Sequence, residues 1–315
     1  MKPRAERGFV LVCVLWVLAI LTVITLGFGR RAMLDRRAAS YALDHTKAMS
    51  MARGAVERGR VELRNKAVMD ALSHIEGRTS YRQPWAKPVN LLEKENYFDD
   101  ANKEGFKNDI CEYRIRDECG RISINRAPDE ILEEIDALNR TTIRKINARR
   151  LGDRNARQGP QPFQTIEELR YFEGIDEDDW FGTERTPGLR DLLTCWGDGL
   201  ININTAPAAV LECIPEVRKR TIAAIIDYRM GPDGELCTSD DADFKTLDEV
   251  RVELGLGADS LQELRPYCKV NSGLFTITGT ATRRQGKVRA TCVATVAITG
   301  PKAGIIKWRE EFLDP

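Results

Sequence analysis

Five carboxylates lie within one short loop of this sequence and could together bind a metal ion. Residues 230–244 read MGPDGELCTSDDADF and hold, within eleven residues, Asp233, Glu235, Asp240, Asp241 and Asp243. Like charges at this density repel one another, and a hard cation with roughly six to eight oxygen ligands would relieve the repulsion. Their spacing differs from the EF-hand pattern, so the alternative is a solvated acidic loop. Any cation bound here would be structural, because no nucleophile stands nearby.

Motifs for catalysis are absent from the rest of the sequence. No GxSxG, HExxH or phosphate-binding Walker pattern occurs. Lysine plus arginine number 48 and aspartate plus glutamate number 48, so the chain lacks the basic excess typical of nucleic-acid binders. The sequence therefore predicts a protein that is not an enzyme.

The N-terminus combines a short basic leader with a long apolar run. The run Phe9 to Gly29 contains no charged residue and spans 21 residues, about 31 Å as a helix, which is enough to cross a bilayer. It is longer than the apolar core of a secretory signal, and no small-x-small cleavage site follows it. Positive charge flanks both ends, so charge alone gives no orientation.

The helical pattern continues beyond the apolar run. No proline occurs from Ala32 to Asn65, and small and apolar residues recur there at near-helical spacing. The sequence leaves two arrangements open, one continuous helix from about Phe9 to Asn65 or a membrane anchor followed by a separate stalk helix.

These N-terminal residues resemble the type IV pilins and pseudopilins. In that family a prepilin peptidase cuts after the glycine, here Gly8, and methylates the new amino terminus, here Phe9. The fifth mature residue is usually glutamate, which neutralises a neighbouring subunit's terminal amine in the apolar filament core. In this chain that residue is Cys13, which cannot do so.

The missing acid and the run VLVCVLWVLAILTV resemble the general secretion pathway protein K family, the minor pseudopilins of type II secretion. A subunit with none above it has no amine to neutralise, so the loss of the acid suits the filament tip. Members of that family carry calcium in a helical domain, and the resemblance therefore implies Ca²⁺ in the acidic loop.

The middle of the chain is duplicated. Residues 120–150 align without gaps on residues 199–229, with 13 of 31 positions identical, and residues 162–170 resemble residues 243–251. Each copy reads as a short strand and three helices, with Asn204 or Thr205 as a predicted N-cap in the second copy. The pairs Asn125 and Asn204, and Arg150 and Arg229, are identical in type.

The copies also resemble the helix-hairpin-helix repeats of competence DNA receptors, so a membrane-anchored DNA-binding receptor is the alternative function. That motif needs a tight turn with glycines, where two backbone N–H groups approach a phosphate. The corresponding turns, residues 136–139 and 215–218, contain no glycine, and each contains an acid. The sequence therefore favours a helical scaffold.

Alternating residues predict two β-hairpins, at 109–125 and at 274–300. Cys111 and Cys119 could bridge the first hairpin, Cys195 and Cys268 fall at comparable points of the two copies, and seven cysteines outside the apolar run leave one unpaired. These cysteines suit an oxidising compartment.

The predicted fold is α+β, with a long N-terminal helix, a pilin-like antiparallel sheet and a large inserted all-α domain of two similar modules. The segments are a leader (1–8), a transmembrane part (9–29), an amphipathic spine (30–66), an α/β core (67–124 and 271–315) and an inserted helical domain (125–270).

The resemblance implies a single-pass inner-membrane protein with its C-terminal head in the periplasm. It implies that the chain initiates and caps a pseudopilus that supports export of folded proteins. The implied partners are other minor pseudopilins, the prepilin peptidase, the inner-membrane secretion platform and exported proteins, without nucleic acid.

Overall fold

One helix dominates the computed structural model, which describes residues 6–73, 77–93, 109–152 and 159–313. Helix α1 (Glu6–Ser73) holds 68 residues, about 100 Å of continuous helix. Its apolar part has a mean hydropathy of 3.0 over the most apolar window, none of which is buried, so by length and composition it could cross a membrane. Of the two arrangements left open by the sequence, the structure shows the single continuous helix, which runs past residue 66.

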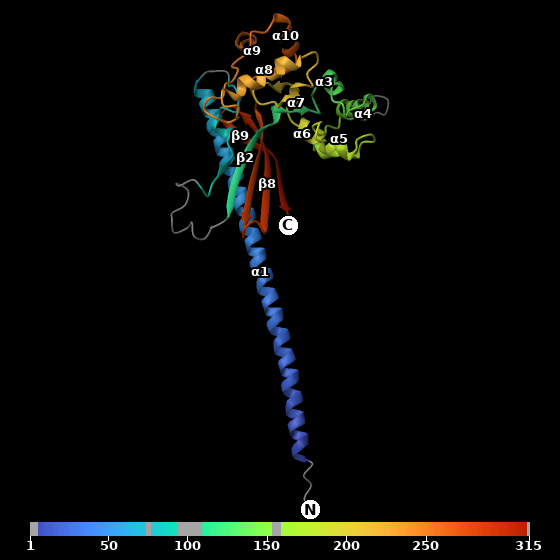
Figure 1. Cartoon of the computed structure of the whole chain (residues 1–315), viewed down its shortest axis with the longest axis vertical. Coiled ribbons are helices and arrows are strands. Elements are labelled where there is room, and N and C mark those ends of the chain that lie inside the picture. Colours follow the sequence, from blue (N-terminus) through green and yellow to red (C-terminus); the bar gives the residue numbers. More distant parts are fainter. Residues whose placement is uncertain (1–5, 74–76, 94–108, 153–158, 314–315) are drawn as a thin grey trace, which may run out of the picture.

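A five-stranded antiparallel sheet packs against the C-terminal half of α1 (Figure 1). Its order is β1 (Val89–Asn90), β2 (Ile110–Asp117), β7 (Leu274–Arg283), β8 (Val288–Thr299) and β9 (Lys302–Leu313). A short 3₁₀ turn, η1 (Pro84–Ala86), buries Trp85 beside this sheet. Strand β2 pairs along its whole length with β7, so the sheet joins strands that are far apart in the sequence.

Small residues on α1 allow it to lie close to the sheet. Ala48, Ala52 and Ala55 are fully or almost fully buried there. On the strand side, Gly279 of β7 lies directly beneath the helix, and a Cβ atom at this position would overlap the carbonyl oxygen of Ala52. The helix and sheet thus form one close-packed core around Tyr113 and other buried side chains.

The helical domain is inserted in the chain between β2 and β7 and has a hydrophobic core of its own. It covers the end of the sheet that is remote from the N-terminus (Figure 1). Its first module holds β3 (Ile122–Ser123), α3 (Asp129–Glu133), α4 (Arg140–Leu151), η4 (Ile166–Tyr171), α5 (Glu177–Phe181), α6 (Leu189–Leu192) and β4 (Leu193–Thr194). The second holds β5 (Ile201–Asn202), α7 (Ala208–Leu211), α8 (Lys219–Met230), α9 (Leu247–Glu253), α10 (Ala258–Leu264) and β6 (Cys268–Lys269). In each module the first strand pairs in parallel with the last.

The identical asparagines of the two copies make identical contacts. The side chain of Asn125 accepts from the backbone N–H of Phe163 at 2.7 Å and donates to its carbonyl at 2.9 Å. Asn204 does the same with Phe244, at 2.9 Å and 2.9 Å. The prediction of an N-cap at Asn204 or Thr205 is wrong, since Pro207 precedes α7 and Asn204 is used to hold the third helix.

The identical arginines tie the second helix of each module to its first loop. Arg150 donates to the carbonyls of Ile124 and Ala127, at 3.0 Å and 2.7 Å. Arg229 makes the equivalent pair of bonds, at 3.1 Å and 2.6 Å, but no described carboxylate pairs with it as Asp129 pairs with Arg150. Burial lowers the pKa of Arg229 to about 10. These polar contacts explain why the duplicated residues are the same.

The structure confirms the predicted α+β class and the hairpin at 274–300, which is β7 and β8. The hairpin predicted at 109–125 is wrong. Strand β2 ends at Asp117, a 3₁₀ turn η3 (Glu118–Gly120) redirects the chain, and β3 pairs with β4 in the helical domain. The alternation of residues was correct, but the partner strands are distant in sequence.

The cysteine prediction falls with that hairpin. Cys111 lies near the start of β2, whereas Cys119 lies in η3 beyond the end of that strand. The strand alone separates them by about 20 Å, so they cannot form a bridge. All eight cysteines are free in the structure, including Cys195 and Cys268. Burial raises the pKa of the Cys195 and Cys268 thiols to about 12 in each case.

Candidate functional site

The residues at the predicted cleavage site lie on the exposed apolar part of α1. Phe9 is 72% exposed, and Cys13 is exposed on the same helix. Gly8 lies within α1, whereas residues 1–5 of the predicted leader lie outside the described residues. A helix surface this apolar requires lipid or neighbouring chains around it.

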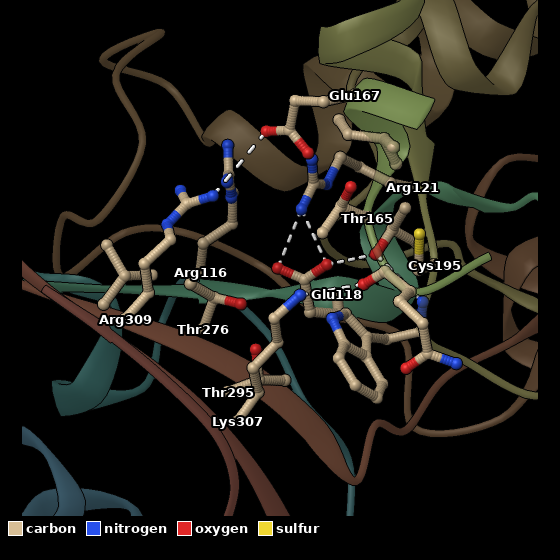
Figure 2. Close-up of a pocket in the computed structure, with 15 residues that line it drawn as sticks. Arg116, Glu118, Arg121, Thr165, Glu167, Cys195, Thr276, Thr295, Lys307 and Arg309 are labelled. Carbon is tan, nitrogen blue, oxygen red and sulfur yellow. Dashed lines mark hydrogen bonds and ion pairs between the residues drawn. The ribbon is translucent and has the colours of Figure 1, made fainter. Parts of the chain in front are cut away.

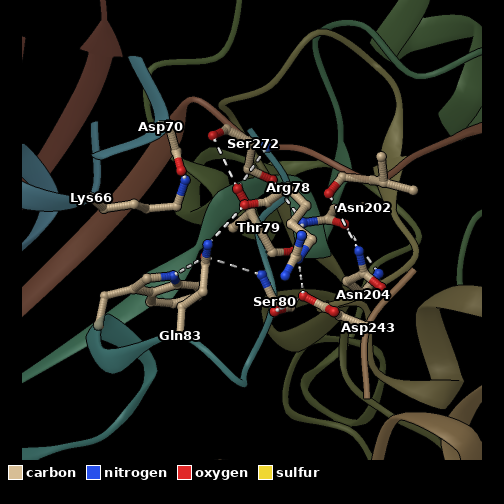
Figure 3. Close-up of polar contacts among 12 residues, drawn as sticks. Lys66, Asp70, Arg78, Thr79, Ser80, Gln83, Asn202, Asn204, Asp243 and Ser272 are labelled. Atoms are coloured by element: carbon tan, nitrogen blue, oxygen red, sulfur yellow. Dashed lines mark hydrogen bonds and ion pairs between the residues drawn. The ribbon is translucent and has the colours of Figure 1, made fainter. Parts of the chain in front are cut away.

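The acidic loop between α8 and α9 does not bring all five carboxylates together. Asp243 is buried and accepts from Arg78 at 2.5 Å and from the Ser80 hydroxyl at 2.9 Å (Figure 3). This contact fixes the end of the loop to the segment that follows α1. Asp243 is therefore neutralised by protein donors, and its role as a cation ligand finds no support.

The remaining acids surround the hydroxyl of Thr238. The Thr238 Oγ1 lies 2.8 Å from Asp240 Oδ1 and 3.0 Å from Asp241 Oδ1. One hydroxyl has one proton, so only one of these two oxygens can accept it and the other faces an oxygen. Asp233 is adjacent, since its N–H donates to Asp240 Oδ2 at 3.2 Å.

This arrangement fits a cation in part. No group of three or more His, Cys, Asp or Glu side chains is placed to hold a metal ion in the part of the chain that the structure describes. Asp240 and Asp241 nevertheless supply two converging carboxylates with excess acceptor oxygens, and Glu235 is exposed beside them. Hydrogen bonds from Thr238 and from the backbone of Asp233 lower the pKa of Asp240, which favours the charged form.

Asp117 joins the two cores where the chain leaves the sheet, and no motif in the sequence indicates this role. Its carboxylate is buried and accepts from Asn202, Thr205 and Ser272 side chains at 2.8, 2.6 and 2.6 Å. Asn202 also donates to the Thr79 carbonyl and to Ser272, in the network of Figure 3. Burial raises the pKa of Asp117 despite these donors. The network locks the helical domain onto the sheet.

The two turns that would bind DNA in a helix-hairpin-helix protein are unsuited to phosphate. In the first module Asn139 accepts from the N–H groups of Thr141 and Thr142, both at 2.9 Å, so the start of α4 is already capped. In the second module Glu216 occupies a left-handed conformation with φ of 64°, where the DNA-binding motif would place glycine. Its side chain adds negative charge to that turn.

Comparison with known proteins identifies a shared fold. No family model matches the sequence, and no curated protein matches it. Among solved structures, the chain is similar to a chain of the crystal structure of the GspK–GspI–GspJ complex from the type 2 secretion system of enterotoxigenic Escherichia coli. The TM-score is 0.51 at 15% sequence identity, and the match covers 89% of this chain and 99% of that chain. The likeness therefore covers most of this chain and nearly all of the other, and it concerns the fold.

Proposed function

We propose that this chain is a minor pseudopilin at the tip of a type II secretion pseudopilus, similar to general secretion pathway protein K. The observation that carries the proposal is the combination of three parts over nearly the whole chain. A single helix has an exposed apolar half, its other half packs on an antiparallel sheet, and a duplicated helical domain is inserted between β2 and β7.

The long helix would hold the subunit in the membrane before assembly and would pack inside the filament afterwards. Its apolar half spans the inner membrane while the head lies in the periplasm. After cleavage behind Gly8, the same apolar surface packs against helices of neighbouring subunits in the filament. Cys13 carries no charge that could pair with a terminal amine above it, which is consistent with the topmost position.

The position of the helical domain supports the same conclusion. It extends over the end of the sheet that points away from the N-terminus of α1 (Figure 1). In a filament with the N-terminal helices inside, a subunit stacked above this one would clash with the helical domain. The chain would therefore start and cap a pseudopilus, and it would not stand in its middle.

Calcium would hold the acidic loop in its folded form. Asp240 and Asp241, together with Asp233 and loop oxygens, are the residues that would bind Ca²⁺. The ion would neutralise the carboxylates that face one another. The ion pair of Asp243 with Arg78 would connect the ordered loop to the segment that follows α1.

The proposed partners are minor pseudopilins of the GspI and GspJ type, with the prepilin peptidase and the inner-membrane platform acting during assembly and exported proteins meeting the tip. A complementation experiment tests this role. In cells that lack the native gene, the parent chain restores secretion, Cys13→Ser also restores it, and Gly8→Leu does not because the peptidase cannot cut. Normal secretion without the gene, or with Gly8→Leu, would refute the proposal.

A further inference from the structure

A small cavity lies between the helical domain and the face of the sheet that is turned away from α1. Its volume is 130 Å³, and Arg116, Arg121, Lys307 and Arg309 contribute four cationic groups to its lining. Figure 2 shows these side chains converging from β2, β9 and the segment after η3. The carboxylates in the lining are Glu118 and Glu167.

The strand register explains why cations meet at this place. Arg116 is opposite Thr276, Thr276 is opposite Thr295, and Thr295 is opposite Lys307. These pairs form one row across four strands, on the side opposite the face that buries Phe275 and Val296 against α1. The row thus presents two threonines between two cationic ends.

The charges in the cavity do not balance. Glu118 pairs with Arg121 at 2.6 Å, and Glu167 lies 3.7 Å from Arg309 (Figure 2). Lys307 donates to the carbonyl of Gln164 at 2.8 Å and has no carboxylate partner among the described residues. The second cation without a paired carboxylate is Arg116 of β2.

Arg116 lines the cavity from β2. Within the described part of the chain its guanidinium makes neither a hydrogen bond nor an ion pair. Its side chain is exposed at the rim of the cavity, where Glu118 and Asp191 lie near enough to act on its pKa but neither forms an ion pair with it. Arg116 and Lys307 are therefore the two cations of the lining that no described carboxylate pairs directly.

Arg121 supplies an independent indication of a missing acceptor. Its side chain is 10% exposed, and its Nε atom is buried without a hydrogen-bond partner among the described residues. A buried donor without an acceptor destabilises the site, because the donor has lost its water without gaining a protein partner. An oxyanion in the cavity would accept hydrogen bonds and offset the positive charge.

We propose that this cavity binds a carboxylate side chain presented by a neighbouring subunit of the tip complex. The volume suits one acidic side chain, since it is close to that of cavities that accept benzene-sized groups. Lys307 and Arg309 belong to β9, the last strand of the sheet, which pairs with β8 alone, so an adjacent chain can reach the opening along this edge. The inference rests on the proposed function for the identity of the partner.

The test measures the affinity of the full chain in detergent for the GspI–GspJ pair of the same secretion system. The double variant Arg116→Gln with Lys307→Gln removes the unpaired charges, and we expect it to weaken binding about tenfold or more. The control double variant Arg114→Gln with Lys302→Gln removes the same charge from β2 and β9 outside the cavity. We expect it to change the affinity by less than about twofold.

A second arm uses a defined probe and needs no partner subunit. A fluorescent peptide of alternating glutamate and glycine should bind the parent chain and the control variant, whereas its glutamine counterpart should not. Binding of the acidic peptide should be lost in the Arg116 and Lys307 double variant while that variant keeps the parent melting temperature.

The outcomes separate the two proposals. If the parent binds neither GspI nor GspJ, the proposed function fails, whereas the peptide arm still decides on the cavity. Equal affinities of the two double variants for the pair, or for the acidic peptide, would overturn the inference and leave the proposed function standing. Binding of inorganic phosphate without any binding of the acidic peptide would also overturn it.

Discussion

Replacing Asp117 by alanine should uncouple the two cores of the head. The carboxylate accepts four hydrogen bonds, from the backbone N–H of Cys119 at 2.9 Å and from Asn202, Thr205 and Ser272 at 2.8, 2.6 and 2.6 Å. Each donor left unsatisfied in a buried position costs about 1–3 kcal/mol. Relief from burying the charge offsets part of that sum, so we expect a loss of about 3 kcal/mol in the free energy of unfolding.

Urea unfolding of the full chain in detergent, followed by tryptophan fluorescence, measures this loss. Trp85 is buried beside the sheet and Trp180 in the helical core, so both cores report. The variant should unfold in two separate transitions, with the helical domain released first. Glu112→Ala on the same strand is the control, since its side chain is 30% exposed, and it should cost less than about 0.5 kcal/mol. A loss for Asp117→Ala as small as that of the control would refute the reasoning.

Three further predictions concern other contacts of the head. Gly279→Ala should destabilise the fold by about 1–3 kcal/mol in the same assay, because its Cβ would overlap the carbonyl oxygen of Ala52; an unchanged unfolding midpoint would contradict this packing. The double hydrogen bond from Arg53 lowers the pKa of Glu310 to about 2, so the stabilisation by this carboxylate is present above about pH 4.5 and fades as the pH falls towards 2. The difference in melting temperature between the parent and Glu310→Gln should shrink over that range, and a constant difference would oppose the assignment. Calcium should raise the melting temperature of the parent but not of Asp241→Ala, whereas a parent that does not respond to calcium would exclude the loop as a site.

The long helix and the duplicated modules could be predicted because their signals are local. The absence of proline after Phe9 and the apolar periodicity specify a helix, and the repeat shows which residues are equivalent. The equivalence of Arg150 and Arg229 was visible in the sequence. Their bonds to backbone carbonyls were not, because no local rule indicates where a buried arginine finds its acceptors.

The strand pairing of the sheet could not be predicted in the same way. Residues 110–117 alternate as a strand should, but their partner β7 lies about 160 residues later in the chain, beyond the reach of hairpin rules. The bridge between Cys111 and Cys119 was inferred from that hairpin and failed with it. Strand β9 was missed because its many charged residues, such as Lys307, are typical of an edge strand.

The two candidate sites differ for a related reason. The acidic loop stood out as a cluster in the sequence, yet Asp243 is neutralised by Arg78, which lies 165 residues earlier. The cationic cavity left no trace in the sequence, because Arg116 and Lys307 become neighbours only through the order of the strands. Charged residues that are adjacent in the sequence are therefore easier to predict as a site than charged residues that the fold brings together from distant strands.

The mass of the intact protein extracted from membranes tests the central claim most directly. We expect a chain that begins at Phe9 and carries one methyl group on its amino terminus, as in a pseudopilin cut after Gly8. A chain that retains residues 1–8 in cells with an active prepilin peptidase would refute the proposed pseudopilin function.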